Sequence, residues 1–124
     1  MADLEMTVSD GIATMTMNRP DARNALSMEM RSEMDRLFHV AGFDDAVRCI
    51  VLEGAGDHFM AGGDIKSMHE YLGSHDAAET QAYFLHRIHD LHTIMFSMRR
   101  MPKPIVAKVR GAAAGAGVSF AAAC

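Results

Sequence analysis

Residues 47–64 read VRCIVLEGAGDHFMAGGD, and this stretch decides the class of fold. Its first part, Cys49-Ile50-Val51-Leu52, is a continuous apolar run between polar and glycine-rich flanks. Such a run predicts a strand that is buried on both faces of a parallel or mixed sheet. The later Ala61-Gly62-Gly63-Asp64 predicts a loop beyond that strand, where α/β sheets place their ligands. We expect a short helix to begin at Ile65.

Upstream of this stretch the pattern predicts a β-hairpin followed by a helix. Residues 4–8 and 12–17 both alternate apolar and polar side chains, and Ser9-Asp10-Gly11 between them is a turn signal. Ser27 is placed to cap the helix that follows. The apolar face of that helix is predicted at Met30, Met34, Leu37, Phe38 and Ala41.

Downstream, Asp76 and Glu79 predict the capped start of a long helix. Its apolar stripe is predicted at Phe84, Ile88, Leu91, Met95 and Met98. A strand is expected at residues 105–109, and the Ala/Gly-rich stretch after Gly111 predicts a tight strand-to-helix turn with exposed backbone N–H groups. The resulting order of elements is typical of an α/β fold with right-handed crossovers.

Composition restricts the kinds of partner that the chain can have. Its 124 residues fit one domain, with 49% hydrophobic and 23% charged residues. The net charge is -4 and no basic stripe is present, so we expect no nucleic-acid partner. No apolar segment approaches the ~20 residues that span a bilayer, and the acidic start is unlike a leader. Cys49 and Cys124 show neither metal nor disulfide spacing, which favours a cytoplasmic setting.

Two glycine-rich loops could carry chemistry. Gly62-Gly63 and Gly115-Ala116-Gly117 each follow a predicted strand, so converging main-chain N–H groups could polarise a carbonyl. Plain turns are the alternative at this stage. Neither loop matches a phosphate-binding P-loop or a complete dinucleotide motif, which disfavours ATP and NAD.

The remaining polar candidates are weaker. His86, His89 and His92 share part of a helix face, but a structural zinc site needs further ligands, so we predict a polar face and no metal. Asp57-His58 lies beside the first glycine-rich loop without a paired nucleophile. Ser119 as a nucleophile lacks an adjacent base.

Four blocks of sequence stand in one order along the chain. They are Asn18-Arg19-Pro20 with Asn24-Ala25-Leu26, then residues 47–56, residues 59–66 and residues 103–117. Together they resemble the enoyl-CoA hydratase/isomerase (crotonase) family. The resemblance implies a crotonase-like ββα spiral of the α/β class, with a hairpin start and a mixed or parallel sheet flanked by helices. Residues 1–124 would be the N-terminal part of one such domain, truncated before its C-terminal helical region.

The resemblance also implies roles for particular residues. In the family, the residue after the "AG" pair and the middle residue of the later glycine-rich triplet supply the oxyanion-hole N–H groups, which here are Gly63 and Ala116. The family's CoA contacts, carried over, point to Arg23, Ala25, Ala61, Asp64, Ile65 and Lys66. For Arg23 a solvated loop charge stays open, and for Asp64 a helix cap does.

One position departs from the family's pattern. Family hydratases carry a glutamate two residues after the triplet, where this chain has Ser119. Serine cannot act as a base near neutral pH, which favours isomerase-like or one-carboxylate chemistry over two-glutamate hydration. The family's second acidic residue would lie beyond Cys124.

The function expected from the resemblance is an acyl-CoA-binding enzyme of fatty acid metabolism that stabilises a thioester enolate. CoA would arrive with the substrate, no other cofactor is expected, and the family implies a trimer-based homo-oligomer. The alternative is a catalytically incomplete CoA-binding or assembly fragment. A third possibility is an interaction module, suggested by the 12 methionines.

Overall fold

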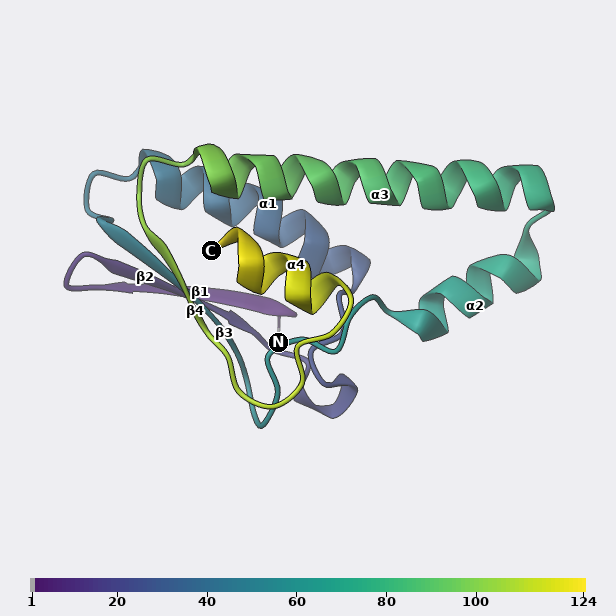
Figure 1. Cartoon of the computed structure of the whole chain (residues 1–124), viewed down its shortest axis with the longest axis horizontal. Helices are drawn as coiled ribbons and strands as arrows, with labels where there is room; N and C mark the ends of the chain where they lie inside the picture. Colours follow the sequence, from purple (N-terminus) through teal and green to yellow (C-terminus); the bar gives the residue numbers. More distant parts are fainter. Residues whose placement is uncertain (1) are drawn as a thin grey trace.

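A mixed four-stranded sheet with helices packed along one face forms the body of the computed structural model, which describes residues 2–124 (Figure 1). The elements in chain order are β1 (Leu4–Ser9), β2 (Ile12–Met17), the short 3-10 helix η1 (Pro20–Ala22), α1 (Met28–Phe43), β3 (Cys49–Gly54), α2 (Ile65–Ser74), α3 (Ala77–Arg100), β4 (Ile105–Lys108) and α4 (Ala116–Ala123). The strand order is β1-β2-β3-β4, with β1 antiparallel to β2 and the other pairs parallel.

The predicted hairpin is confirmed, and its turn explains the register. Asp10 and Gly11 have φ of 52° and 80°, the left-handed values that a two-residue hairpin turn needs. Ser9 therefore pairs directly with Ile12. The Gly11 carbonyl also accepts the Arg48 N–H at 2.7 Å, which fixes the start of β3 beside β2.

The core lies between the sheet and the helices, on one face of the sheet. Ala13, Met15 and Met17 of β2 and Ile50 and Leu52 of β3 are fully buried. The prediction that β3 is buried on both faces is wrong, because Cys49 and Val51 on its other face stay partly exposed. No element within residues 2–124 covers that second face, where Ile12 and Val106 are also exposed.

Helix α1 follows the prediction closely. The Ser27 side chain accepts the Met30 N–H at 3.0 Å, and all five residues of the predicted apolar face are buried. At the other end, the Lys103 ammonium donates to the carbonyls of Ala41 and Asp44 at 2.8 and 2.7 Å. A cation at these carbonyls complements the negative end of the helix dipole.

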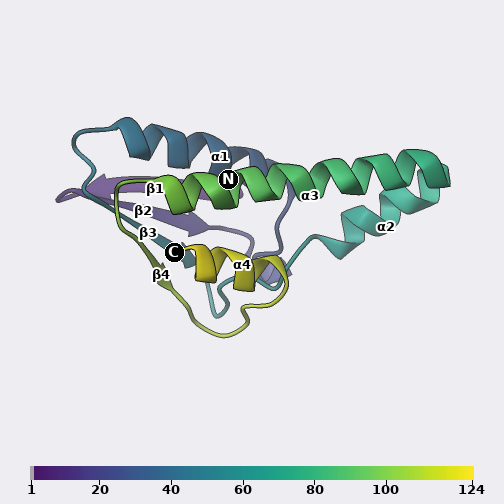
Figure 2. The same cartoon turned by 45° about the horizontal axis from the view of Figure 1, so that its top comes forward.

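Helices α2 and α3 form an arm that extends beyond the sheet (Figures 1 and 2). We define the arm as residues 65–93. Its helices are joined by aromatic stacking, with the Tyr71 and Tyr83 ring centroids 3.7 Å apart. The capped start of α3 is confirmed, since Asp76 accepts the Glu79 N–H at 2.8 Å.

The apolar stripe predicted on α3 is confirmed in part, since Met98 is buried and Phe84 is partly buried. Ile88 is 50% exposed, and the buried face consists of Thr80, Arg87, Ile94 and Met98. Leu91 and Met95 lie partly buried at its edge. The buried face differs from the predicted stripe because α3 crosses α1 and α4 along a line that includes two polar side chains, Thr80 and Arg87, which an apolar pattern cannot reveal.

Candidate functional site

Three loops meet below the sheet and form the candidate site. Loop A (residues 18–26) follows β2, loop B (55–64) follows β3, and loop C (109–115) follows β4. The carboxyl ends of parallel strands share one edge of a sheet, which brings these loops together. Figure 1 shows them side by side with the starts of α2 and α4.

Asn24 joins loop A to loop B from a fully buried position. Its amide nitrogen donates to the carbonyls of Ala55 and His58 at 3.0 and 2.8 Å. Its amide oxygen accepts the Arg19 N–H at 2.9 Å. The side chain therefore makes three hydrogen bonds to main chain, and its own φ of 56° is one that asparagine tolerates well.

Main-chain hydrogen bonds continue this junction towards Gly63. The Ala61 N–H donates to the Arg23 carbonyl at 3.0 Å, and the Leu26 N–H donates to the Gly62 carbonyl at 2.8 Å. Leu26 and Gly63 form an isolated parallel bridge. Loops A and B thus run together like two short strands, and Gly63 is held by main-chain pairing.

Loop C packs against loop B almost entirely through main chain. Met60 and Ala113 form a second parallel bridge, and the Ala112 N–H donates to Nδ1 of His58 at 2.9 Å. A Cβ added to Gly117 would lie 2.2 Å from the Met60 carbonyl oxygen. Only glycine permits so close an approach of the two segments.

The two N–H groups predicted to bind an oxyanion, those of Gly63 and Ala116, flank a contact between Gly62 and Gly115. A Cβ added to Gly115 would lie 3.5 Å from the Gly62 Cα, so the residues that precede Ala116 and Gly63 touch. Within residues 2–124, no group accepts a hydrogen bond from the N–H of Gly63 or of Ala116. Ala116 is also the first residue of α4, where the helix dipole favours negative charge.

Asp64 has a structural role in this chain. One carboxylate oxygen accepts the Ser67 N–H at 3.2 Å and caps α2, and the other lies 3.2 Å from the Arg19 guanidinium. The same guanidinium donates to the Ala25 carbonyl at 2.6 Å. The helix cap that the sequence left open for Asp64 is therefore observed.

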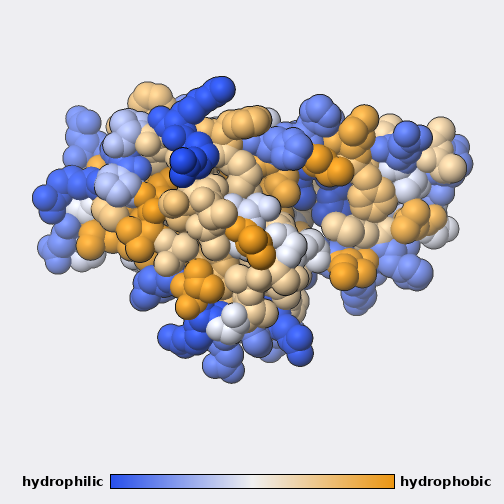
Figure 3. Space-filling view, in the orientation of Figure 1, coloured by the Kyte–Doolittle hydropathy of each residue, from blue (hydrophilic) through white to orange (hydrophobic). Residues whose placement is uncertain are grey.

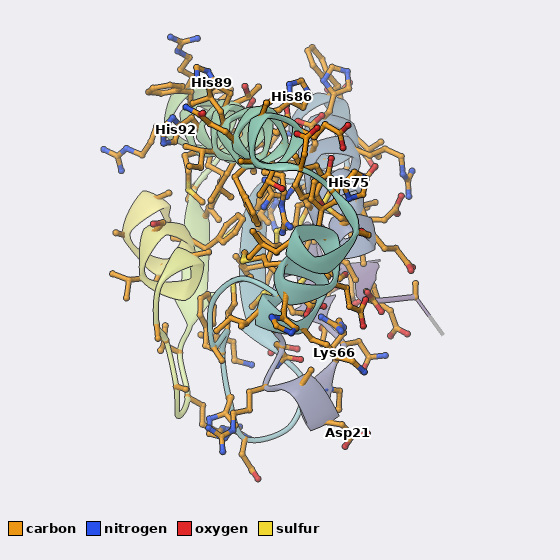
Figure 4. The ribbon with its side chains drawn as sticks, turned by 90° about the vertical axis from the view of Figure 1, so that its right-hand side faces the viewer. Asp21, Lys66, His75, His86, His89 and His92 are labelled. Carbon is orange, nitrogen blue, oxygen red and sulfur yellow. The ribbon has the colours of Figure 1, made fainter. Side chains whose placement is uncertain are left out.

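The other residues carried over from the family lie on loops A and B or at the start of α2. Arg23, Ile65 and Lys66 are exposed, whereas Ala25 and Ala61 are partly buried. Lys66 and Asp21 project from the same side of the molecule in Figure 4, far from the histidines of α3. Their exposure leaves them available to a ligand.

Comparison with known proteins identifies the family of this chain. A family model described as enoyl-CoA hydratase/isomerase matches residues 7–124. The chain belongs to the enoyl-CoA hydratase/isomerase family.

Two of the relatives that the chain matches are named as isomerases. A trans-2-decenoyl acyl-carrier-protein isomerase of Streptococcus mutans is 35% identical over 117 residues, which cover 94% of this chain and 43% of that protein. A 1,2-epoxyphenylacetyl-CoA isomerase of Escherichia coli is 31% identical over 114 residues, covering 92% and 42%. The chain thus spans less than half the length of these curated relatives.

Solved structures confirm the crotonase-type fold. PA4980 of Pseudomonas aeruginosa matches with a TM-score of 0.90 and 31% identity, over 100% of this chain and 51% of that one. An enoyl-CoA hydratase/isomerase (crotonase) of Legionella pneumophila matches with a TM-score of 0.85 and 35% identity, over 100% and 46%. The predicted mixed sheet with flanking helices is therefore the fold of this family.

The position of the family glutamate lies on an open surface of this chain. Ser119 is exposed on α4, one helical turn from Ala116, so it shares a helix face with the Ala116 N–H. Serine at this point supplies no general base.

The histidines of the chain do not form a site. His86, His89 and His92 lie along the outer side of α3 (Figure 4), and no cluster of metal-ligating side chains is found in the described part of the chain. His58 accepts a hydrogen bond from Ala112, so its role is to support loop C. Residues 2–124 also include no helix that is long and apolar enough to cross a membrane.

A surface groove of about 970 Å³ lies away from the loops, between the second half of α1 and the end of α3. Its apolar lining includes Phe43, Phe96 and Met101, and no residue of loops A, B or C contributes. The groove therefore takes no part in the candidate site.

Sequence reasoning quoted Asn24 only as part of a family block, and it missed the burial of Arg31 and Arg87. The role of Asn24 depends on carbonyls some thirty residues away, at Ala55 and His58, for which the local sequence carries no signal. A weak signal existed for Arg87, because Thr80, Arg87 and Ile94 recur at a spacing of seven on one helix face.

Proposed function

We propose that this protein binds an acyl-CoA thioester and stabilises its enolate between the main-chain N–H groups of Gly63 and Ala116. One observation carries the proposal: these two N–H groups have no acceptor within residues 2–124, although they flank the contact of Gly62 with Gly115. Unpaired donors at a rigid main-chain junction suit an oxygen that gains negative charge.

The surroundings favour such a charge. The positive end of the α4 dipole lies at Ala116, and loops B and C are held by hydrogen bonds that need no rearrangement during reaction. Each preorganised oxyanion donor is typically worth about 3 kcal/mol in the transition state. Figure 3 shows hydrophobic surface over α4 in the middle of this face, where Val118 is 54% exposed, which suits an acyl group.

For the reaction itself, we favour migration of a double bond or another one-carboxylate reaction. Loss of an acidic C–H proton to a base would give the enolate, and return of a proton to a different carbon would move the double bond. Ser119 cannot be the base, so a carboxylate outside this chain's described residues would serve. Two relatives named as isomerases support this choice over hydration.

Recognition of CoA would fall to loops A and B and to α2. Arg23 and Lys66 are exposed cations for its phosphates, and Ile65, which is 77% exposed, offers an apolar contact. The proposal includes no cofactor other than the CoA of the substrate. It retains a homo-oligomer, with no nucleic-acid or membrane partner, and a reducing cytoplasmic setting in which Cys49 and Cys124 stay free.

The second candidate is binding without turnover. Asp64, which adjoins Gly63, is engaged by the α2 cap and by Arg19, and Ser119 is no carboxylate. An assembly unit that holds acyl-CoA but lacks its base would show these same features.

A proline at residue 116 separates these possibilities. Proline is well tolerated as the first residue of a helix, and Gly115, with φ 53° and ψ -121°, has a conformation that glycine can keep before proline. Ala116→Pro thus removes one N–H without removing a hydrogen bond of the described fold. Ala116→Ser, which keeps the N–H, is the matched control.

Calorimetry with crotonyl-CoA and with free crotonate would measure binding, and conversion of 3-enoyl-CoA to 2-enoyl-CoA would measure turnover. In the whole protein, with the carboxylate base in place, we expect the wild type and Ala116→Ser to bind only the thioester and to turn over, with turnover of Ala116→Pro lower by about 100-fold. Thioester binding without turnover in the wild type would establish the second candidate. Failure of the folded wild type to bind crotonyl-CoA would refute both.

A further inference from the structure

Four buried polar atoms in the seam between α1 and α3 have no hydrogen-bond partner in the described part of the chain. They are Nε of Arg31, Nε and Nη2 of Arg87, and Oγ1 of Thr80. Thr80 and Arg87 lie seven residues apart on one face of α3, and Arg31 lies opposite in the first turns of α1. Buried polar groups are almost always paired in folded proteins, so this concentration requires an explanation.

The two guanidinium groups are deeply buried and share a site without a counter-ion. Arg87 is 3% exposed and Arg31 is 7% exposed. Arg31 donates from Nη1 to the Arg87 carbonyl, and Arg87 donates from Nη1 to the Tyr83 hydroxyl at 3.3 Å. No carboxylate within residues 2–124 forms an ion pair with either one.

The two positive charges, on Arg31 and Arg87, repel each other. Burial lowers the pKa of Arg31, and the neighbouring Arg87 lowers it further, whereas Asp90 and Tyr83 raise it more weakly. Partial compensation comes from aromatic rings, since the Arg87 guanidinium lies 5.3 Å from the Tyr83 ring centroid and 6.0 Å from that of Phe84. An unpaired buried charge is strongly unfavourable, so the seam is suited to receive an anion.

The geometry of the free donors favours a carboxylate. Nε and one terminal nitrogen of Arg87 together form the donor fork that binds a planar carboxylate through two parallel hydrogen bonds. Arg31 Nε and the Thr80 hydroxyl are further donors from the two sides of the seam. An alkyl chain in the same place would leave all four atoms unpaired.

The seam lies within reach of the proposed thioester site. Arg31 follows Leu26 by five residues, and Leu26 pairs with Gly63. Five residues span at most about 18 Å even when fully extended, and the helical turn shortens that distance. Access requires the arm to shift, and α2 contributes no buried residue that would resist such a movement.

We propose that Arg31, Arg87 and Thr80 bind the distal carboxylate of the substrate's acyl group. The substrate class is then the CoA mono-thioesters of dicarboxylic acids. The CoA part of this inference rests on the proposed function. The carboxylate site itself depends only on the seam, so a free dicarboxylate is the other possible source of the same group.

The test compares matched thioesters by calorimetry with the whole 124-residue chain. Each dicarboxylyl-CoA, from succinyl-CoA to suberyl-CoA, is paired with the saturated monocarboxylyl-CoA of equal carbon number. We expect at least one dicarboxylyl-CoA to bind about tenfold more tightly than its partner, because hydrogen bonds to charged groups are strong. Arg87→Met should bind both members of that pair equally, at the affinity of the monocarboxylyl-CoA.

Two further measurements keep the test decisive. Removing an unpaired buried charge should raise the Tm of Arg87→Met and of Arg31→Met, and a fall in both would overturn the inference by showing that the arginines stabilise the fold. Free glutarate should raise the Tm of the wild type and leave that of Arg87→Met unchanged.

The possible failures are distinguishable. Equal affinity within every thioester pair, with no effect of glutarate, would overturn the inference while leaving the proposed function intact. If no thioester binds but glutarate stabilises only the wild type, the proposed function fails and the carboxylate site stands, with a free dicarboxylate as its ligand.

Discussion

The junction of loops A, B and C and the arm (residues 65–93) are held together by different kinds of interaction. At the junction, loops A, B and C are joined by main-chain hydrogen bonds, by the buried Asn24 amide and by glycines in backbone contact. In the arm, α2 buries no residue, and its tie to α3 consists of stacked aromatic rings such as Tyr71 on Tyr83. The junction is therefore held by specific hydrogen bonds and close backbone contacts, whereas α2 is held to α3 mainly by stacked aromatic rings.

The proposed function would make two demands on the structure, and this difference separates them. A donor that stabilises developing charge must be in place before the reaction, which requires a rigid junction. A segment over the substrate must open and close, and such segments come from the least stable parts of a fold. Measurements that compare the effects of substitutions in the junction and in the arm therefore test whether the first is rigid and the second mobile.

The largest contrast is expected between two glycines. In Gly54→Ala the new Cβ would lie 2.1 Å from the His58 carbonyl oxygen and 2.6 Å from the Asn24 amide nitrogen. Since both neighbours belong to the junction, we expect a loss of about 3 kcal/mol or more in the free energy of unfolding. Urea denaturation followed by circular dichroism would measure it.

Gly73 provides the matched control in the arm. A Cβ there meets nothing within 4 Å, and the residue lies in α2. Gly73→Ala should raise the free energy of unfolding by about 0.5 kcal/mol through the helix preference of alanine. Equal effects of the two substitutions would contradict the contrast between the regions.

Asn24→Ala should be the next most damaging change. It leaves the carbonyls of Ala55 and His58 and the N–H of Arg19 without their partner, at a cost of about 2–3 kcal/mol. Asn24→Gly, which suits the φ of 56° but also lacks the amide, should recover only part of this loss. Full recovery in the glycine variant would show that the amide contributes little. Urea denaturation would measure the free energy of unfolding of both variants.

Two helix caps, one in each region, allow a comparison with smaller expected changes in the free energy of unfolding. Ser27→Ala removes the cap of α1 in the core and should lower the free energy of unfolding by about 1 kcal/mol. Asp76→Ala removes the cap of α3 in the arm. It should change global stability by less than about 0.5 kcal/mol, because an exposed helix end frays locally.

Amide hydrogen exchange distinguishes the two caps directly. We expect faster exchange confined to the first turns of α3 in Asp76→Ala. In Ser27→Ala the exchange of the β1 and β2 amides should also rise, since α1 contacts β1, which pairs with β2. Faster β-sheet exchange in Asp76→Ala would show that the arm is coupled to the core.

Another small effect, which depends on pH, concerns Glu53 in β3. The Lys108 ammonium at 2.9 Å lowers the pKa of this carboxyl, with a lesser contribution from the Thr16 hydroxyl at 3.0 Å. The ionised form therefore stabilises the fold at pH values above the unfolded-state pKa, and this contribution is lost as the pH falls through the lowered folded-state pKa.

Glu53→Gln measures that contribution. Because the Lys108 side chain is largely exposed, the loss at neutral pH should be less than about 1 kcal/mol. Stability curves of the wild type and the variant should converge in acid, where both side chains are neutral. A constant difference across the pH range would assign the effect to packing.

Local signals sufficed where the determining atoms are neighbours in sequence. The Asp10-Gly11 turn, the caps at Ser27 and Asp76, and the buried face of α1 were all predictable for this reason. The two glycine-rich loops were recognised from their composition. Their contact at Gly62 and Gly115 joins residues more than fifty positions apart, and only the fold reveals it.

Features that depend on distant partners could not be predicted. The exposed second face of β3 depends on what packs there, so the apolar run around Val51 was read as buried on both sides. Arg87 is charged, and its burial results from the way α3 crosses α1. Asp64 could be named as a cap or a ligand residue, and the Ser67 N–H that it accepts shows the cap.

If charge is stabilised by main-chain N–H groups, as we propose, there is a consequence for how this scaffold can change. Every amino acid except proline carries an N–H, so substitutions at Ala116 leave that donor in place, whereas glycines such as Gly117 leave no room for alternatives. Ser119, exposed one turn further along α4, is constrained by neither. An engineer could therefore install a carboxylate there, as in Ser119→Glu, and exchange the chemistry of the scaffold while its donors stay fixed.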